Sequence, residues 1–156
     1  MEAMPENKIA LQRATPEDVA ALIAIDEKVA SPTYSPILDE KELLADMEKG
    51  PFYLMKKGNE TVGSISYERR KDGTVYIAGL AMDPKYQRQG FARQALQQVL
   101  EEVKDAPSVD LVTHPGNEAS VALYTSLGFE ITERKENYYG DGKPRVVMIL
   151  KREKQA

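Results

Sequence analysis

The segment Gln87-Arg88-Gln89-Gly90-Phe91-Ala92-Arg93 combines residue types that suit the binding of phosphate groups. Glycine has no Cβ, so the backbone at Gly90 can come close to a bulky anion. The two glutamines and two arginines add side-chain hydrogen-bond donors, and the arginines also carry positive charge. This combination predicts a cradle for a pyrophosphate.

The residues on either side of this segment predict a strand before it and a helix after it. Val75 to Met82 is almost wholly apolar, which is typical of a strand buried on both faces. Beyond Gly90, apolar residues recur at helical spacing: Ala92, Ala95, Leu96, Val99, Leu100 and Val103. A helix that begins at Gly90 presents unpaired backbone N–H groups and the positive end of its dipole to an anion.

Two widespread phosphate-binding motifs do not fit this segment, whereas a third does. A Walker A loop ends in Gly-Lys-Ser/Thr, and a dinucleotide fingerprint needs three glycines where this loop has one. The loop resembles instead the Gln/Arg-x-x-Gly-x-Gly/Ala signature of the GNAT superfamily, the acyl-coenzyme A-dependent N-acetyltransferases. The resemblance implies that residues 87–93 bind acetyl-coenzyme A, the co-substrate of a reaction that uses no metal.

A second motif, Asn117 to Phe129, strengthens the resemblance. It reads Asn-Glu-Ala-Ser-Val-Ala-Leu-Tyr-Thr-Ser-Leu-Gly-Phe and is similar to the family signature Asn…Ala…Leu-Tyr-x-x-Leu-Gly-Phe. Tyr124 follows Asn117 by two helical turns, so both residues lie on the same side of a helix. In the family this Asn contacts the cofactor and this Tyr lies near the thioester sulfur. The resemblance therefore implies that Tyr124 is the general acid for the leaving thiolate.

Composition indicates one globular domain and excludes several classes of protein. The 156 residues are 42% hydrophobic and 29% charged, which suits a soluble single domain over residues 1–156 with loose ends at 1–7 and 152–156. The absence of cysteine excludes disulfides and thiolate metal sites, and we expect no metal. A net charge of −4 argues against nucleic acid, and no apolar run reaches membrane-spanning length. We expect a cytoplasmic protein without a nucleic-acid or membrane partner.

The predicted elements follow the order strand, helix, helix, three strands, helix, strand, helix and two strands. Strands are expected near residues 9–13, 52–56, 61–69, 75–82, 109–114, 129–133 and 146–151. Antiparallel hairpins followed by βαβ units predict a mixed α/β sheet with helices on both faces. This is also the GNAT order. The resemblance implies a mostly antiparallel sheet of six to seven strands with about four helices, splayed apart between its fourth and fifth strands.

The resemblance also implies how the two substrates meet. Acetyl-coenzyme A enters the gap between the fourth and fifth strands from one side, and the amine enters from the other. Backbone groups of Leu80, Ala81 and Met82 hold the pantetheine arm, and one amide among them polarises the thioester carbonyl.

The sequence leaves open which group takes the proton from the amine. In the similar bacterial ribosomal-protein alanine N-acetyltransferases, a glutamate stands at the position of Val112. The fourth strand has Ala78 and Gly79 where other members place an acid. One alternative is Tyr76, where some protein N-terminal acetyltransferases carry a catalytic tyrosine. The others are His114, the only histidine, and a chain of water molecules.

The acceptor is predicted to be a primary amine, either on a small molecule or at a protein N-terminus. Asn137-Tyr138-Tyr139-Gly140 resembles a segment of protein N-terminal acetyltransferases, which implies that Tyr138 and Tyr139 line the acceptor channel together with Tyr34. The missing carboxylate keeps a second hypothesis open, a non-catalytic module that binds acyl-coenzyme A as a sensor. Family members are often monomers or dimers, so we expect a monomer or a homodimer.

Overall fold

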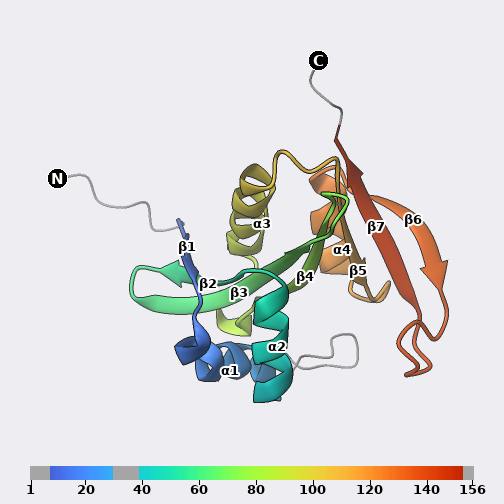
Figure 1. Ribbon diagram of the computed structural model, residues 1–156. Helices are drawn as coiled ribbons and strands as arrows, with labels where there is room; N and C mark the ends of the chain where they lie inside the picture. Colours follow the sequence, from blue (N-terminus) through green and yellow to red (C-terminus); the bar gives the residue numbers. More distant parts are fainter. Residues whose placement is uncertain (1–7, 30–38, 153–156) are drawn as a thin grey trace.

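The computed structural model describes residues 8–29 and 39–152, and its centre is a mixed seven-stranded sheet (Figure 1). The order across the sheet is β1-β2-β3-β4-β5-β7-β6. Neighbouring strands are antiparallel except β4 and β5, which are parallel. The strands are β1 (Ala10–Arg13), β2 (Phe52–Lys57), β3 (Glu60–Arg69), β4 (Val75–Met82), β5 (Ser108–Thr113), β6 (Glu130–Lys135) and β7 (Arg145–Lys151).

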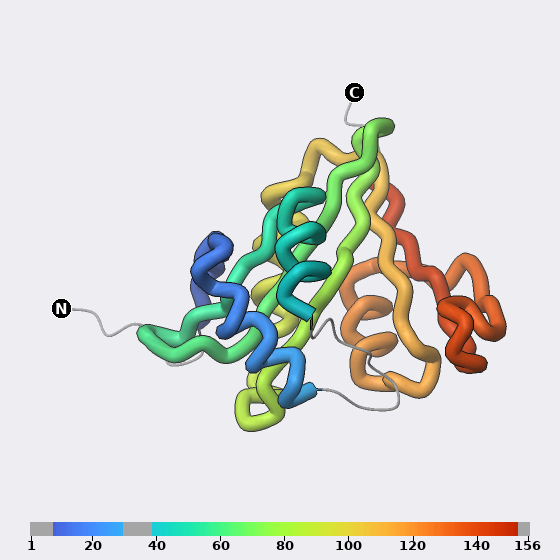
Figure 2. Tube along the Cα trace, turned by 60° about the horizontal axis from the view of Figure 1, so that its bottom comes forward, coloured from blue at the N-terminus to red at the C-terminus, as the bar shows by residue number. Residues whose placement is uncertain are grey.

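Helices cover both faces of this sheet. In the described chain they are α1 (Val19–Val29), α2 (Glu40–Lys49), α3 (Phe91–Glu102) and α4 (Glu118–Ser126), with short 3-10 turns η1 (Pro16–Asp18) and η2 (Pro84–Tyr86). α1 and α2 lie on one side of the first four strands and α3 lies on the other (Figures 1 and 2). None of the helices within residues 8–29 and 39–152 has the length and apolar character to cross a membrane. The element order and the mixed sheet confirm the predicted architecture.

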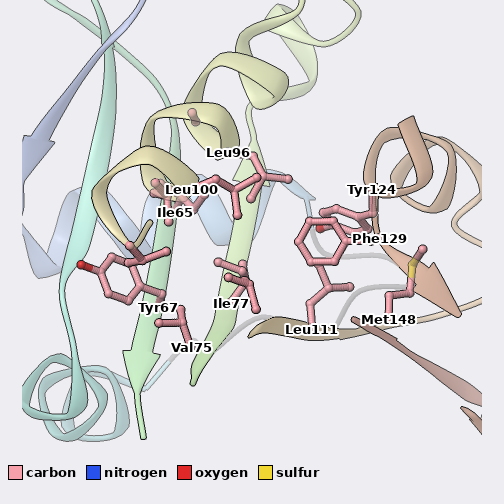
Figure 3. Packing of buried hydrophobic residues seen from close by; sticks show 14 of the residues in the cluster. Ile65, Tyr67, Val75, Ile77, Leu96, Leu100, Leu111, Tyr124, Phe129 and Met148 are labelled. Carbon is pink, nitrogen blue, oxygen red and sulfur yellow. The ribbon is translucent and has the colours of Figure 1, made fainter. Parts of the chain in front are cut away.

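Two hydrophobic clusters, one on each face of the sheet, explain this layering. Consecutive residues of a strand point to opposite faces, and Leu54 and Met55 of β2 accordingly enter different clusters. The smaller cluster contains Leu22 of α1 and Leu43 of α2. The larger cluster joins α3 and α4 to β3, β4, β5 and β7, and Leu96 of α3 lies at its centre (Figure 3).

β4 and β5 separate soon after they begin. β4 has eight residues, yet its pairing with β5 is limited to Val75 with Val109 and Tyr76 with Asp110. Beyond these two pairs, the backbone groups on the β5 side of β4 have no strand partner among the described residues. The structure therefore has the predicted splay between the fourth and fifth strands.

A β-bulge in β4 coincides with this separation. Ser66 of β3 faces Gly79, whereas the next residue, Tyr67, faces Ile77. Ala78 is therefore an extra residue without a partner on β3. A bulge bends its strand and increases the local twist, so the bulge at Ala78 carries the second half of β4 away from β5.

Replacing Leu96 by Ala tests the core that positions α3. The Leu96 side chain is 0% exposed, so Leu96→Ala should lower the free energy of unfolding by about 2–5 kcal/mol. Leu44→Ala on α2 is the matched control, because Leu44 is 39% exposed and should change the free energy by roughly 0.5 kcal/mol or less. Urea unfolding of both variants measures the difference, and equal effects would contradict the assigned core.

Candidate functional site

The loop before α3 and the second half of β4 border a groove of about 630 Å³. Residues at the end of α1 and in α4 complete the walls of the groove. Every residue predicted to bind coenzyme A lines this groove except Gln89, which is exposed. The structure thus brings the strand residues Leu80, Ala81 and Met82 together with the glycine loop and Asn117.

The N-terminus of α3 is open toward a ligand. α2 and α4 begin with side-chain caps, since Asp39 accepts from Lys41 and Glu42 and Asn117 accepts from Ser120. α3 begins at Gly90, which has no side chain to cap the first N–H groups. Gly90 has a φ of 81°, and apart from its chain neighbours no atom of the described residues lies within 4 Å of the place a Cβ would take there. The first turn of α3 therefore keeps backbone donors for an anion.

The charges around the groove favour an anionic ligand. Lys28, Arg88 and Arg93 line it, and no Asp or Glu belongs to the described lining, although the chain carries a net charge of −4. Arg88 has a φ of 65°, which is uncommon for a residue other than glycine and marks a strained loop. The described residues contain no group of three or more His, Asp or Glu placed to hold a metal ion.

Two polar contacts fix helices at the edges of the groove. Lys28 of α1 forms an ion pair of 3.0 Å with the buried carboxylate of Asp83, which directly follows β4. The Lys85 N–H and the Lys28 ammonium hold the pKa of Asp83 below its usual range. Arg93 of α3 donates to the hydroxyl of Ser126 in α4. These contacts tie α1 to the end of β4, and α3 to α4.

A second pocket, of about 480 Å³, lies at the gap between β4 and β5. It is lined by residues of both strands, of α4 and of the loop between β6 and β7. Leu80, Asn117 and Ser120 line both this pocket and the groove, so these three residues border both spaces. The groove and the second pocket are therefore neighbours at the point where β4 meets the start of α4.

Tyr124 lies close to this junction. It comes from α4, lines the second pocket and is 7% exposed, with its ring packed against that of Phe129 at a centroid distance of 5.9 Å. In Figure 3 its hydroxyl points from α4 toward the side of β4. Burial raises the pKa of the Tyr124 phenol above its ordinary value, so this hydroxyl stays protonated at neutral pH.

Tyr76 lies on β4 at the last pair with β5 and lines the second pocket. Its ring packs under the Arg70 guanidinium at 5.4 Å, and Arg70 is in turn bound by Asp110 of β5. Burial, and next the neighbouring Tyr139 hydroxyl, raise the pKa of Tyr76 above the usual range. A raised pKa makes the phenolate scarce at neutral pH, so the hydroxyl of Tyr76 is suited to orienting a water molecule rather than removing a proton itself.

His114 differs from its predicted setting, because β5 ends at Thr113 and His114 belongs to the turn that follows. Its Nδ1 accepts a hydrogen bond of 2.8 Å from the Gly116 N–H. A neutral ring with Nδ1 as acceptor carries its proton on Nε2 and has no unused lone pair. His114 lines the second pocket, but it would have to break this bond to act as a base.

The loop between β6 and β7 supplies the outer wall of the second pocket. Tyr139 lines it, whereas Tyr138 is not part of the lining and packs edge-on against Tyr139 at 4.7 Å. Tyr34 lies outside the described residues. Asp141 and Arg145 also line the pocket, although no motif in the sequence predicts them as site residues. In the sequence, only the spacing of four residues between the acid and the base suggests an ion pair. The burial of Arg145 depends on tertiary packing, which the sequence does not show.

Comparisons with known proteins place this geometry in a family. A model described as Acetyltransferase (GNAT) family matches residues 17–129. The Escherichia coli ribosomal protein bS18-alanine N-acetyltransferase is 30% identical over 102 residues, which are 63% of this chain and 68% of that protein. The crystal structure of the Escherichia coli ribosomal-protein-S18-alanine N-acetyltransferase has a TM-score of 0.82 at 22% identity, covering 96% of this chain and 97% of that chain.

Two further relatives add information on the donor and the acceptor. Human N-alpha-acetyltransferase 30 is 31% identical over 96 residues, which are 58% of this chain and 26% of that protein. A GNAT family acetyltransferase from Elizabethkingia anophelis with acetyl-CoA bound has a TM-score of 0.71 at 22% identity, covering 92% of this chain and 97% of that chain.

A methyl group at Gly90 should weaken coenzyme A binding. In Gly90→Ala the new Cβ occupies space beside the α3 N-terminus that the other described residues leave empty, and we expect the dissociation constant for coenzyme A to rise at least about tenfold, or about 1.4 kcal/mol. Gly58→Ala is the matched control, because Gly58 also has a positive φ (61°) and open space but lies in the β2–β3 turn. Calorimetry measures both affinities, and equal dissociation constants for the two variants would contradict a cofactor role for this loop.

Proposed function

We propose, from the premise that this chain belongs to the acetyltransferase (GNAT) family, that it acetylates the α-amine of protein N-termini with acetyl-coenzyme A. The observation that carries the proposal is the junction of the groove and the second pocket at Leu80, Asn117 and Ser120. Two substrates that bind in these spaces at the same time would meet there. The acceptor class is supported by relatives named for ribosomal-protein alanine and for N-alpha acetylation.

The groove fits acetyl-coenzyme A by its chemistry. The uncapped α3 N-terminus and the Arg88 and Arg93 guanidinium groups suit a pyrophosphate. The backbone of β4 beyond Ala78, which has no strand partner on the β5 side, suits the amides of a pantetheine arm. A structural relative with acetyl-CoA bound supports the same ligand here. Bound in this way, acetyl-coenzyme A would supply the thioester that is attacked.

The second pocket receives the amine in this proposal. A primary amine attacks the thioester carbonyl only in its neutral form, and an α-amine with a pKa near 8 loses its proton at pH 7 at a cost of about 1.4 kcal/mol. Tyr76 has a hydroxyl at the pocket wall and His114 has its Nδ1 occupied. We therefore assign proton removal to a water molecule oriented by the Tyr76 hydroxyl, with the proton leaving through the pocket to solvent.

Tyr124 is proposed to protonate the leaving thiolate. Its hydroxyl is protonated at neutral pH, as a phenol with an ordinary pKa near 10 already is, and Tyr124 lines the pocket. The sensor hypothesis rested on the missing acids at Val112 and Ala78. Since Tyr76 and Tyr124 nevertheless line the pocket and the chain belongs to an enzyme family, we retain the catalytic function.

The acceptor class is tested by measuring free thiol from acetyl-coenzyme A with three sets of amines. The sets are peptides with free N-termini and no lysine, N-terminally blocked peptides that contain lysine, and small primary amines. We expect the first set to give the highest kcat/KM. Turnover of small amines or lysine with no turnover of any free N-terminus would contradict the proposed acceptor.

Tyr124→Phe should lower kcat by roughly 10²–10⁴, the usual effect of losing one general acid. Phe fills nearly the same volume, so the fold and the affinity for acetyl-coenzyme A should change little. The matched control is Tyr53→Phe, because the Tyr53 hydroxyl is bound to Glu102 and lines neither pocket. A Tyr124→Phe enzyme with the kcat of the wild type would show that Tyr124 only packs.

A further inference from the structure

The second pocket contains one ion pair whose role the proposed reaction does not explain. Among the described residues that line it, Asp141 is the only carboxylate and Arg145 the only guanidinium. Arg145 opens β7 and Asp141 lies four residues earlier, in the loop that leads from β6. Both residues therefore border the space that we assign to the acceptor, and the Asp141 side chain is the more exposed of the two.

The Arg145 side chain is buried and fixed by several contacts, unlike a typical arginine on a protein surface. Its side chain is 5% exposed, and arginine is rarely buried without a partner. One guanidinium nitrogen donates to the Asp141 Oδ2 at 3.0 Å, and the other donates to the Pro144 carbonyl at 2.9 Å. The guanidinium also lies over the Tyr139 ring at 5.1 Å. Arg145 thus fixes both Asp141 and Tyr139 at the pocket wall.

Asp141 keeps capacity for a further donor. Its Oδ1 accepts from the Lys143 N–H at 2.9 Å and its Oδ2 accepts from Arg145, whereas an ionised carboxylate offers about four acceptor positions. The Asp141 side chain is 32% exposed, so a ligand can reach it. The Lys143 N–H and the Arg145 guanidinium also hold its pKa below the usual range. The Asp141 carboxylate therefore stays ionised at neutral pH and is a weak base.

We propose that Asp141 is a specificity-determining residue that binds the acceptor as its protonated amine, and that Arg145 is the positioning residue that holds Asp141 in place. An α-amine with a pKa near 8 is about nine-tenths protonated at pH 7, so the ammonium is the form that arrives. Its attraction to a fixed carboxylate at the exposed wall brings it to the pocket before the proton is lost near Tyr76. This inference deepens the proposed function and rests on the second pocket being the acceptor site.

The test compares two acceptors that differ in charge. One is the amine that the wild-type enzyme acetylates best, protonated at the assay pH, and the other is a weakly basic primary amine that is neutral at that pH. Asp141→Asn should raise KM for the protonated amine at least about tenfold, as expected for a hydrogen bond to a charged group, and leave kcat within about threefold. For the neutral amine, KM should stay unchanged. Asp141→Glu keeps the charge and should recover part of the loss.

Asp105→Asn is the matched control, because Asp105 also pairs with an arginine, Arg69 at 3.3 Å, and lines neither pocket. It should leave both KM values unchanged. Thermal unfolding shows that each variant is folded at the assay temperature. If Asp141→Asn is unfolded at that temperature, Asp141→Ser takes its place in the test, because a serine hydroxyl can still accept a hydrogen bond from the Lys143 N–H.

Two results would overturn the inference. One is an unchanged KM for the protonated amine in the variant without the carboxylate. The other is an equal rise in KM for the protonated and the neutral amine, which would show that Asp141 acts through the shape of the loop. If the wild-type enzyme acetylates a small amine but no peptide N-terminus, the proposed acceptor class fails, while the comparison of the two charges still decides the role of Asp141.

Discussion

The early separation of β4 from β5 is the constraint on which the rest of the structure depends. Parallel strands that continued side by side would satisfy each other's backbone groups and close the sheet. Here the pairing ends at Tyr76 with Asp110, and the bulge at Ala78 turns β4 away. Buried backbone N–H and C=O groups need hydrogen-bond partners. The groups on the β5 side of β4 beyond Tyr76 have no strand partner among the described residues, so they are available to a bound ligand. The groove and the second pocket both border this gap, since Leu80 of β4 lines each of them.

Departures from ordinary local structure gather at one side of the gap. α3 begins without a side-chain cap, Arg88 has a left-handed backbone, and cations collect on a chain of net charge −4. A residue in such a backbone conformation costs of order 1–3 kcal/mol, which the surrounding fold must offset. The buried cluster around Leu96 does so by anchoring α3 firmly on β3 and β4. Backbone strain and cationic side chains are therefore concentrated where we propose that coenzyme A binds.

The parts of the site that the sequence predicts are those set by local spacing. The loop at Gly90 follows from an apolar strand, a glycine and a helical period, and the Asn117–Tyr124 pair follows from one helix. The bulge at Ala78 is hidden because a strand that is apolar throughout gives no alternation from which to detect an extra residue. The Nδ1 contact of His114 depends on the turn at Gly116. Asp141 and Arg145 were missed because only tertiary packing buries the guanidinium and turns the pair toward the pocket.

The central claim is that donor and acceptor occupy the two openings of the gap together and react directly at their junction. Initial rates measured with both acetyl-coenzyme A and the acceptor amine varied test it most directly. Direct transfer in a ternary complex predicts double-reciprocal lines that intersect. Parallel lines, together with an acetylated form of the enzyme isolated in the absence of amine, would contradict the account, because they would mean that the acetyl group passes through a residue of the protein.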